Sequence, residues 1–147
     1  MVDVSKKPFS HRIAVASCVI MAPERIVSAI FDASQALNDK GDIIGCAKIA
    51  GVFAAKRTAE LIPMCHQVPL SQVLVDVSRL TENSLLVTAS AKTVHQTGVE
   101  MEALTAVSVA SLTVYDMTKS ALKGSLDKIT ITDIQLDSKT GGSSSPS

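Results

Sequence analysis

The sequence predicts an α+β fold: a ferredoxin-like antiparallel sheet with helices packed on one face and one inserted helix. Segments in which apolar and polar residues alternate are separated by segments with helical spacing, in the order strand, helix, helix, strand, strand, helix, strand. The composition is 46% hydrophobic but only 3% aromatic, without tryptophan, which predicts an aliphatic, alanine-rich core with close backbone approach. At 147 residues the chain is about one domain long.

The first element expected is a buried strand at 12–21. Basic residues before this apolar run imitate a signal peptide, which is the alternative. The run is rich in β-branched residues, however, and Ser17 interrupts it. Pro23 follows closely, at a poor place for cleavage and a good one for a first helical turn. We therefore favour a strand.

Two helices should follow, at 24–38 and 43–62, separated by the polar turn NDKGD. The first has an ordinary apolar face that includes Ile26 and Ile30. The second contains Gly45, Gly51 and several alanines, which suit a close helix contact, and it should end before Pro63.

The second half of the chain predicts a hairpin, a long helix and a last strand. Strands at 68–80 and 84–94 are joined by the turn TEN, a helix covers 98–122, and a strand follows at 128–138. The remainder, KTGGSSSPS, is too polar to pack. We expect one domain at 1–138 and a flexible tail at 139–147.

Charge and cysteine content exclude several classes of function. Fourteen basic and fourteen acidic residues balance, which argues against binding to nucleic acid or to an anionic membrane. No apolar stretch approaches the ~18 residues of a membrane span. Three scattered cysteines without a CxxC pair predict neither a disulfide framework nor a metal site, and fit a reducing cytoplasm.

The predicted helix at 98–122 has charged ends and an uncharged middle. Glu100 and Glu102 fit the favourable end of a helix dipole, with Thr97 and Gly98 as caps, while Asp116 and Lys119 can form a simple ion pair. The apolar middle covers every side of the helix, which predicts burial all round.

The spacing of the charged ends also constrains function. Glu102 and Asp116 share a face but lie roughly 21 Å apart along the axis, at about 1.5 Å per residue. One small site within one subunit cannot use both. We therefore expect an oligomer with sites at a subunit interface.

A second concentration of chemistry lies between residues 38 and 66. Lys40, Lys48, Lys56 and Arg57 suit a phosphorylated ligand, although a solvated helix face explains Lys48 and Arg57 equally well. The phosphate-binding patterns GxxxxGK[ST] and GxGxxG are both absent. His66 can carry protons at neutral pH, or it can be structural.

The chain contains the motifs KGD, IAGVFAAKRT, LIPMCH, TGVEMEALTAVSVA and LTVYDMTK. Together they resemble the motifs of the MoaC family of cyclic pyranopterin monophosphate synthases, which act in molybdenum cofactor biosynthesis. The resemblance covers nearly the whole chain. It implies a lyase that converts 3′,8-cyclo-7,8-dihydroguanosine 5′-triphosphate to cyclic pyranopterin monophosphate and pyrophosphate without a cofactor. It also implies a homohexamer, a trimer of dimers, with active sites at subunit interfaces.

The same resemblance implies residue roles, position by position. Asp116 and Lys119 match an acid/base pair, and Lys40 matches the essential lysine of KGD. The substrate-binding positions implied are Met64, Cys65, His66, Met101 and Glu102, with Glu100 beside them and Lys56 as a weaker candidate phosphate contact. No metal ligand is implied.

Two alternatives stay open at this point. One is a non-catalytic oligomeric module that binds a small phosphorylated ligand; it would not need an acid, a base and several lysines near one interface. The other is a degenerate homologue that only scaffolds the pathway, which the presence of the motif residues disfavours. Functional coupling to the upstream radical enzyme is compatible with the sequence but not decided by it.

Overall fold

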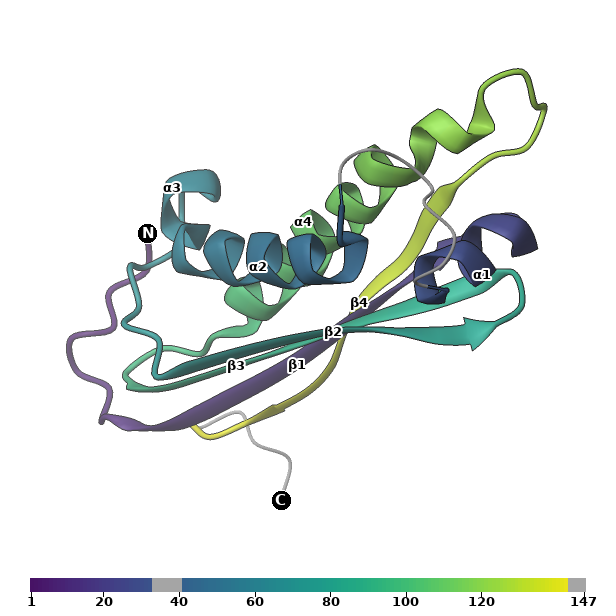
Figure 1. The fold of residues 1–147 in the computed structure, drawn as a ribbon. Helices are drawn as coiled ribbons and strands as arrows, with labels where there is room; N and C mark the ends of the chain where they lie inside the picture. Colours follow the sequence, from purple (N-terminus) through teal and green to yellow (C-terminus); the bar gives the residue numbers. More distant parts are fainter. Residues whose placement is uncertain (33–40, 143–147) are drawn as a thin grey trace.

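A four-stranded antiparallel sheet with helices on one face forms the protein, as predicted (Figure 1). The computed structural model describes residues 1–32 and 41–142. The strands are β1 (Ser10–Met21), β2 (Gln72–Thr81), β3 (Ser84–His95) and β4 (Thr130–Thr140), in the spatial order β2-β3-β1-β4. This is the order of the ferredoxin-like plan, in which the hairpin β2–β3 places β3 beside β1.

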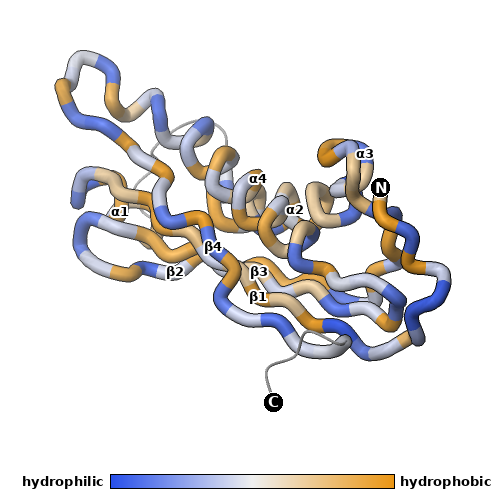
Figure 2. The backbone as a smooth tube through the Cα atoms, turned by 180° about the vertical axis from the view of Figure 1, so that it is seen from behind, coloured by the Kyte–Doolittle hydropathy of each residue, from blue (hydrophilic) through white to orange (hydrophobic). Residues whose placement is uncertain are grey.

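The core lies between the sheet and two long helices, α2 (Ile43–Lys56) and α4 (Glu100–Thr118) (Figures 1 and 2). Alternate residues of β1, such as Ala14, Ala16 and Cys18, face these helices and are buried. A Cβ added to Gly51 of α2 would lie 3.0 Å from the Ala106 carbonyl oxygen of α4. The small residues therefore allow the two helices to approach closely, as the composition predicted.

The two predicted helices before β2 are shorter than expected. The first, α1 (Glu24–Phe31), ends where Asp32 turns to an extended conformation, and the rest of the predicted span to residue 38 lies outside the described residues. The second is divided at Arg57 into α2 and α3 (Thr58–Leu61). The Thr58 hydroxyl donates to the carbonyls of Ala54 and Ala55, so it competes with the amides that would continue the helix.

The hairpin is confirmed, but β2 begins at Gln72 and not at Val68. Pro69 lacks an N–H group for the sheet, and its carbonyl accepts instead from the Thr93 hydroxyl, at 2.6 Å. Backbone pairing with β3 becomes regular only after the Ser71 N–H bonds to the Lys92 carbonyl.

The long helix is confirmed from residue 100, where α4 begins; a 3₁₀ turn, η1 (Lys119–Leu122), extends it. Thr97 and Gly98 are not its caps: the N-cap is Val99, which offers no capping side chain. Buried hydroxyls inside α4 bond to carbonyls one turn back, as Ser111 does to Val107 and Thr118 to Val114. The helix can therefore be buried without unsatisfied hydroxyl groups.

The predicted burial of α4 on every side, which needed a second copy of the chain as cover, is incomplete within one chain, where one stripe stays exposed. Leu112 is 58% exposed and Tyr115 is also exposed, whereas Val107, Ala110 and Val114 are buried. On α2, Ile49 and Phe53 are exposed as well. Apolar surface of this kind is available for packing against another chain.

The flexible tail was predicted to begin at residue 139, but the last strand continues to Thr140. Lys139 and Thr140 belong to β4, where they pair with Ala14 and Ile13 of β1. Gly141 follows with a positive φ of 90° and lies against the His11 carbonyl, where a side chain has no room. Residues 143–147 lie outside the described part of the chain.

Candidate active site

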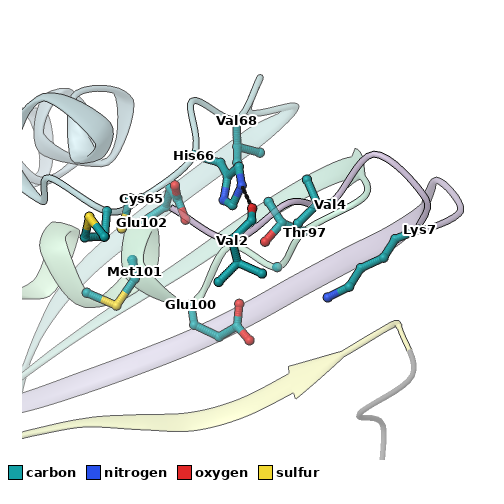
Figure 3. Close-up of a pocket in the computed structure, with 12 residues that line it drawn as sticks. Val2, Val4, Lys7, Cys65, His66, Val68, Thr97, Glu100, Met101 and Glu102 are labelled. Atoms are coloured by element: carbon teal, nitrogen blue, oxygen red, sulfur yellow. Dashed lines mark hydrogen bonds between the residues drawn. The ribbon is translucent and has the colours of Figure 1, made fainter.

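A cavity of about 460 Å³ lies beside the N-terminal end of α4, in the size range of small-molecule sites, about 300–1,000 Å³ (Figure 3). Three separate segments line it: the N-terminal residues, the loop after α3, and the turn that leads into α4. The lining residues are Val2, Val4, Lys7, Met64, Cys65, His66, Val68, Thr97, Gly98, Glu100, Met101 and Glu102. The two segments implied to bind substrate, 64–66 and 101–102, are thus brought to one cavity.

Glu102 is the buried carboxyl of this cavity. Only 4% of the residue is exposed, and no ion pair neutralises it within residues 1–32 and 41–142. Burial raises the pKa of Glu102 above its ordinary value, and the charge of Glu100 raises it further, although its own backbone N–H acts in the opposite direction. Glu102 is therefore disposed to hold a proton that a bound molecule could receive.

The loop after α3 presents Met64, Cys65 and His66 to the same space. The loop is tied to α3 because the Cys65 N–H donates to the Ile62 carbonyl at 3.0 Å. Burial and the nearby charge of Glu102 both raise the pKa of the Cys65 thiol, so it is not activated as a thiolate nucleophile. His66 Nε2 lies 2.7 Å from the Val2 carbonyl oxygen, the contact drawn in Figure 3.

Glu100 and Met101 occupy the first turn of α4 at the mouth of the cavity. The Glu100 carboxylate accepts from Lys139 Nζ of β4 at 3.2 Å. The end of β4 therefore helps to fix the start of α4. The spacing along α4 alone could not have shown this partner, which lies 39 residues further along the chain.

Asp116 and Lys119 lie at the other end of α4 and do not reach this cavity. They form the ion pair that their spacing predicted, 2.6 Å long, with both side chains more than half exposed. The hydrogen bond to Asp116, and then its charge, raise the pKa of Lys119 above its ordinary value. Lys119 is thus held as an ammonium, a form suited to stabilising negative charge.

Two lysine candidates remain, Lys40 and Lys56. Lys40 lies outside the described residues. Lys56 lines a separate groove between α2 and β2, of about 310 Å³, together with Phe53 and Leu74. Within a single chain, Lys56 is not a neighbour of Glu102.

Sequence reasoning missed the N-terminal wall of the cavity. Val2, Val4 and Lys7 line it, and Lys7 adds an ammonium group to the lining. No periodicity marks these residues; the only signal was that the block MVDVSKKP opens the region of family resemblance.

Neither a metal site nor a membrane segment is found in the described parts of the chain. No group of three His, Cys, Asp or Glu side chains there is placed to bind a metal ion. None of the helices there is long and apolar enough to cross a bilayer.

Taken together, these features define an α+β protein with a small-molecule cavity that presents ionisable groups among apolar side chains. Comparison with known proteins narrows this class. The sequence model of the MoaC family matches residues 1–142, and the chain belongs to the MoaC family.

Characterised relatives agree with the family assignment. The chain is 48% identical over 145 residues to the cyclic pyranopterin monophosphate synthase of Thermomicrobium roseum, covering 98% of this chain and 83% of that protein. It is 48% identical to the mitochondrial enzyme of the same name from Arabidopsis thaliana, covering 98% of this chain and 51% of the relative. It is 50% identical to molybdenum cofactor biosynthesis protein 1 of Drosophila melanogaster, covering 97% of this chain and 24% of the relative.

Proposed function

We propose that this protein is a cyclic pyranopterin monophosphate synthase, a lyase of molybdenum cofactor biosynthesis. Its substrate would be 3′,8-cyclo-7,8-dihydroguanosine 5′-triphosphate, and its products cyclic pyranopterin monophosphate and pyrophosphate. The observation that carries the proposal is that segments 64–66 and 100–102, far apart in the sequence, line one cavity of suitable size in a member of the MoaC family.

The groups in the cavity support the chemistry that this reaction needs. Rebuilding a purine ring into a pyranopterin requires proton transfers, and Glu102 is a carboxyl that burial keeps disposed to carry a proton. Cyclisation of the triphosphate releases pyrophosphate, whose charge needs cations nearby. Lys7 lies at the cavity, and we propose Lys40 as a further lysine of the site.

We propose that Asp116 and Lys119 complete the catalytic set from another subunit. Within one chain Asp116 lies roughly 21 Å from Glu102 and Lys119 roughly 25 Å, because the helix rises about 1.5 Å per residue. The exposed apolar side chains Leu112 and Phe53 support assembly, since another copy could cover them. We propose the homohexamer implied by the family, with each site shared between subunits.

The test of the activity is incubation of the purified protein with the cyclised dihydroguanosine triphosphate. After oxidation, the product is expected as a fluorescent pterin, formed together with pyrophosphate. The Glu102→Gln variant serves as the inactive control. A correctly assembled wild-type oligomer that binds the compound but forms neither product would overturn the synthase and leave a non-catalytic binding module.

Shared sites have their own test, which mixes two inactive variants. Glu102→Gln and Lys119→Met subunits are co-expressed with different tags, and oligomers that carry both tags are purified. If each site takes one group from each of two subunits, random assembly should restore about one quarter of the wild-type activity. Mixed oligomers as inactive as the parent variants would place both groups in the same subunit's site. If analytical ultracentrifugation at micromolar concentration gave the mass of a single subunit, the proposed oligomer would be refuted.

The compartment stays a prediction. A reducing compartment such as the cytoplasm fits three unpaired cysteines. Fractionation of the source cells, with detection of the protein by antibody, would decide it.

A further inference from the structure

The N-terminal segment, residues 1–9, forms one wall of the cavity without belonging to the sheet. It runs beside the cavity before β1 begins and contributes Val2, Val4 and Lys7 to the lining (Figure 3). Local hydrogen bonds shape it into a turn: the Ser5 N–H donates to Asp3 Oδ1 at 2.8 Å, and the Lys7 N–H donates to the Val4 carbonyl at 3.0 Å. Such bonds set the shape of the segment but not its place on the protein.

The side chain of Gln96 supplies the attachment. Its Nε2 donates to the carbonyls of Ser5, at 3.1 Å, and of Lys7, at 2.9 Å. The backbone of Gln96 is itself anchored to β1, because its carbonyl accepts from Arg12 Nη2 at 3.3 Å. Gln96 thus joins the wall segment to the turn between β3 and α4, the same turn that leads into Glu100 and Glu102.

The attached segment in turn contacts His66. A carbonyl oxygen only accepts, so at 2.7 Å the Val2 carbonyl requires a hydrogen on His66 Nε2. In the neutral imidazole this leaves the lone pair on Nδ1. The position of the wall segment therefore selects which ring nitrogen of His66 can accept a proton.

We propose that Gln96 is a positioning residue of this site, which fastens the N-terminal segment against the cavity and so holds His66 in its Nε2–H tautomer. The effect of Gln96 on turnover rests on the proposed function. Gln96 acts through the segment and not by touching the reacting atoms. Three observations support this positioning role. They are the two hydrogen bonds that Gln96 donates, the contact between Val2 and His66, and the cavity that these segments share.

The decisive comparison is between two substitutions of Gln96. Leucine has a similar size but no donor, whereas lysine offers only donors and has enough reach for both carbonyls. Gln96→Leu should release the segment and Gln96→Lys should keep it. Gln135→Leu is the matched control, since Gln135 Nε2 donates to Asp137 on β4, away from the cavity. Gln96→Glu repeats the loss of donors in a side chain of the same shape, should Gln96→Leu fold poorly.

Two measurements on the assembled protein do not depend on turnover. Amide hydrogen exchange within residues 2–8 should accelerate roughly 10- to 100-fold in Gln96→Leu, as expected when two hydrogen bonds are lost. In Gln96→Leu, the imidazole ¹⁵N chemical shifts of His66 should move from the values of the Nε2–H tautomer toward those of a mixture of both tautomers. His11 on β1 serves as the reference. Both changes should be absent in Gln96→Lys and Gln135→Leu.

Kinetics then link the attachment to the reaction. Gln96→Leu should raise KM and lower kcat/KM, and Gln96→Lys should restore both. The proposal is overturned if exchange and the His66 shifts stay as in the wild type in Gln96→Leu and Gln96→Glu, or if leucine and lysine impair the protein equally. A wild-type protein without turnover would refute the proposed function, while exchange and tautomer would still decide the attachment.

Discussion

Replacing Glu102 by glutamine should make the protein more stable and less active, and the gain in stability should depend on pH. Glu102 is 4% exposed and has no cationic partner among the described residues, so its charged form lacks both water and a counter-charge. Glutamine keeps the shape and cannot ionise. The substitution therefore removes the unfavourable burial of charge and also removes the proton that we assign to the reaction.

The direction of the pH dependence follows from the raised pKa of Glu102. Between the unfolded value, 4.5, and the higher folded value, the folded chain binds more protons than the unfolded chain. The free energy of unfolding of the wild type therefore falls as pH rises through that interval, and the loss persists above it. In Glu102→Gln this contribution is absent, so the stability difference between variant and wild type should open above about pH 4.5.

Glutamine leaves a polar group buried at this position, so the gain in stability is only the extra cost of burying the charged form. Leaving such a group buried costs about 1–3 kcal/mol, and more when it is charged. We expect Glu102→Gln to raise the free energy of unfolding at pH 8 by at least about 1 kcal/mol, which corresponds to roughly 2–4 °C in melting temperature for a chain of this size. Turnover should fall by about 100-fold or more, as for loss of a general acid or base.

Thermal unfolding at pH 4 and pH 8, at equal protein concentration, measures the effect. Glu82→Gln in the exposed β2–β3 turn is the control for the loss of one negative charge. The expected result is a gain for Glu102→Gln at pH 8 that largely disappears at pH 4 and is absent from the control. A variant less stable than the wild type at pH 8, or equally altered at both pH values, would refute the argument from burial.

Three further substitutions test other parts of the structure. Asp116→Asn should abolish turnover but leave the melting temperature and oligomer nearly unchanged, because the Asp116 carboxylate is more than half exposed; steady-state kinetics with a thermal melt check this. Leu112→Glu should dissociate the oligomer in sedimentation velocity and abolish turnover, whereas Leu126→Glu, fully exposed in the loop before β4, should do neither. Gly141→Ala should destabilise the fold by about 1–3 kcal/mol in chemical denaturation, and clearly more than Gly124→Ala, because both glycines have positive φ but only Gly141 lies against the His11 backbone.

The sheet could be predicted because its strands alternate with a period of two, and its strand order because the order of the elements along the chain is that of the ferredoxin-like plan. Most errors lie at the ends of elements, where single side chains act on the backbone. The Thr58 hydroxyl bonds to carbonyls of the preceding turn just after α2 ends, and Pro69 delays the start of β2. Lys139 was assigned to the tail because its neighbours are polar; its pairing with Glu100 and with β1 is visible only in three dimensions.

The site was predicted in part, for a related reason. Motif resemblance pointed to segments 64–66 and 100–102, and the cavity unites them. The contribution of the N-terminal residues could not be predicted, because it depends on Gln96, a polar residue in a turn with no spacing signal. The lowered acidity of Glu102 was equally hidden, since first-turn carboxylates are ordinarily exposed and only the packed structure shows this one buried.

The geometry of α4 limits how the two groups of ionisable residues can cooperate. It is one continuous helix from Glu100 to Thr118 and contains neither proline nor glycine, so nothing in its sequence produces a sharp kink between its ends. The separation of Glu102 from the Asp116–Lys119 pair is then fixed by the helical rise, at roughly 21 Å or more, which is far more than a proton transfer can bridge. A reaction that uses both groups must take them from different copies of the chain. For that reason we expect the exposed stripe at Leu112 and Tyr115, which lies between the two groups on α4, to matter to catalysis as well as to assembly.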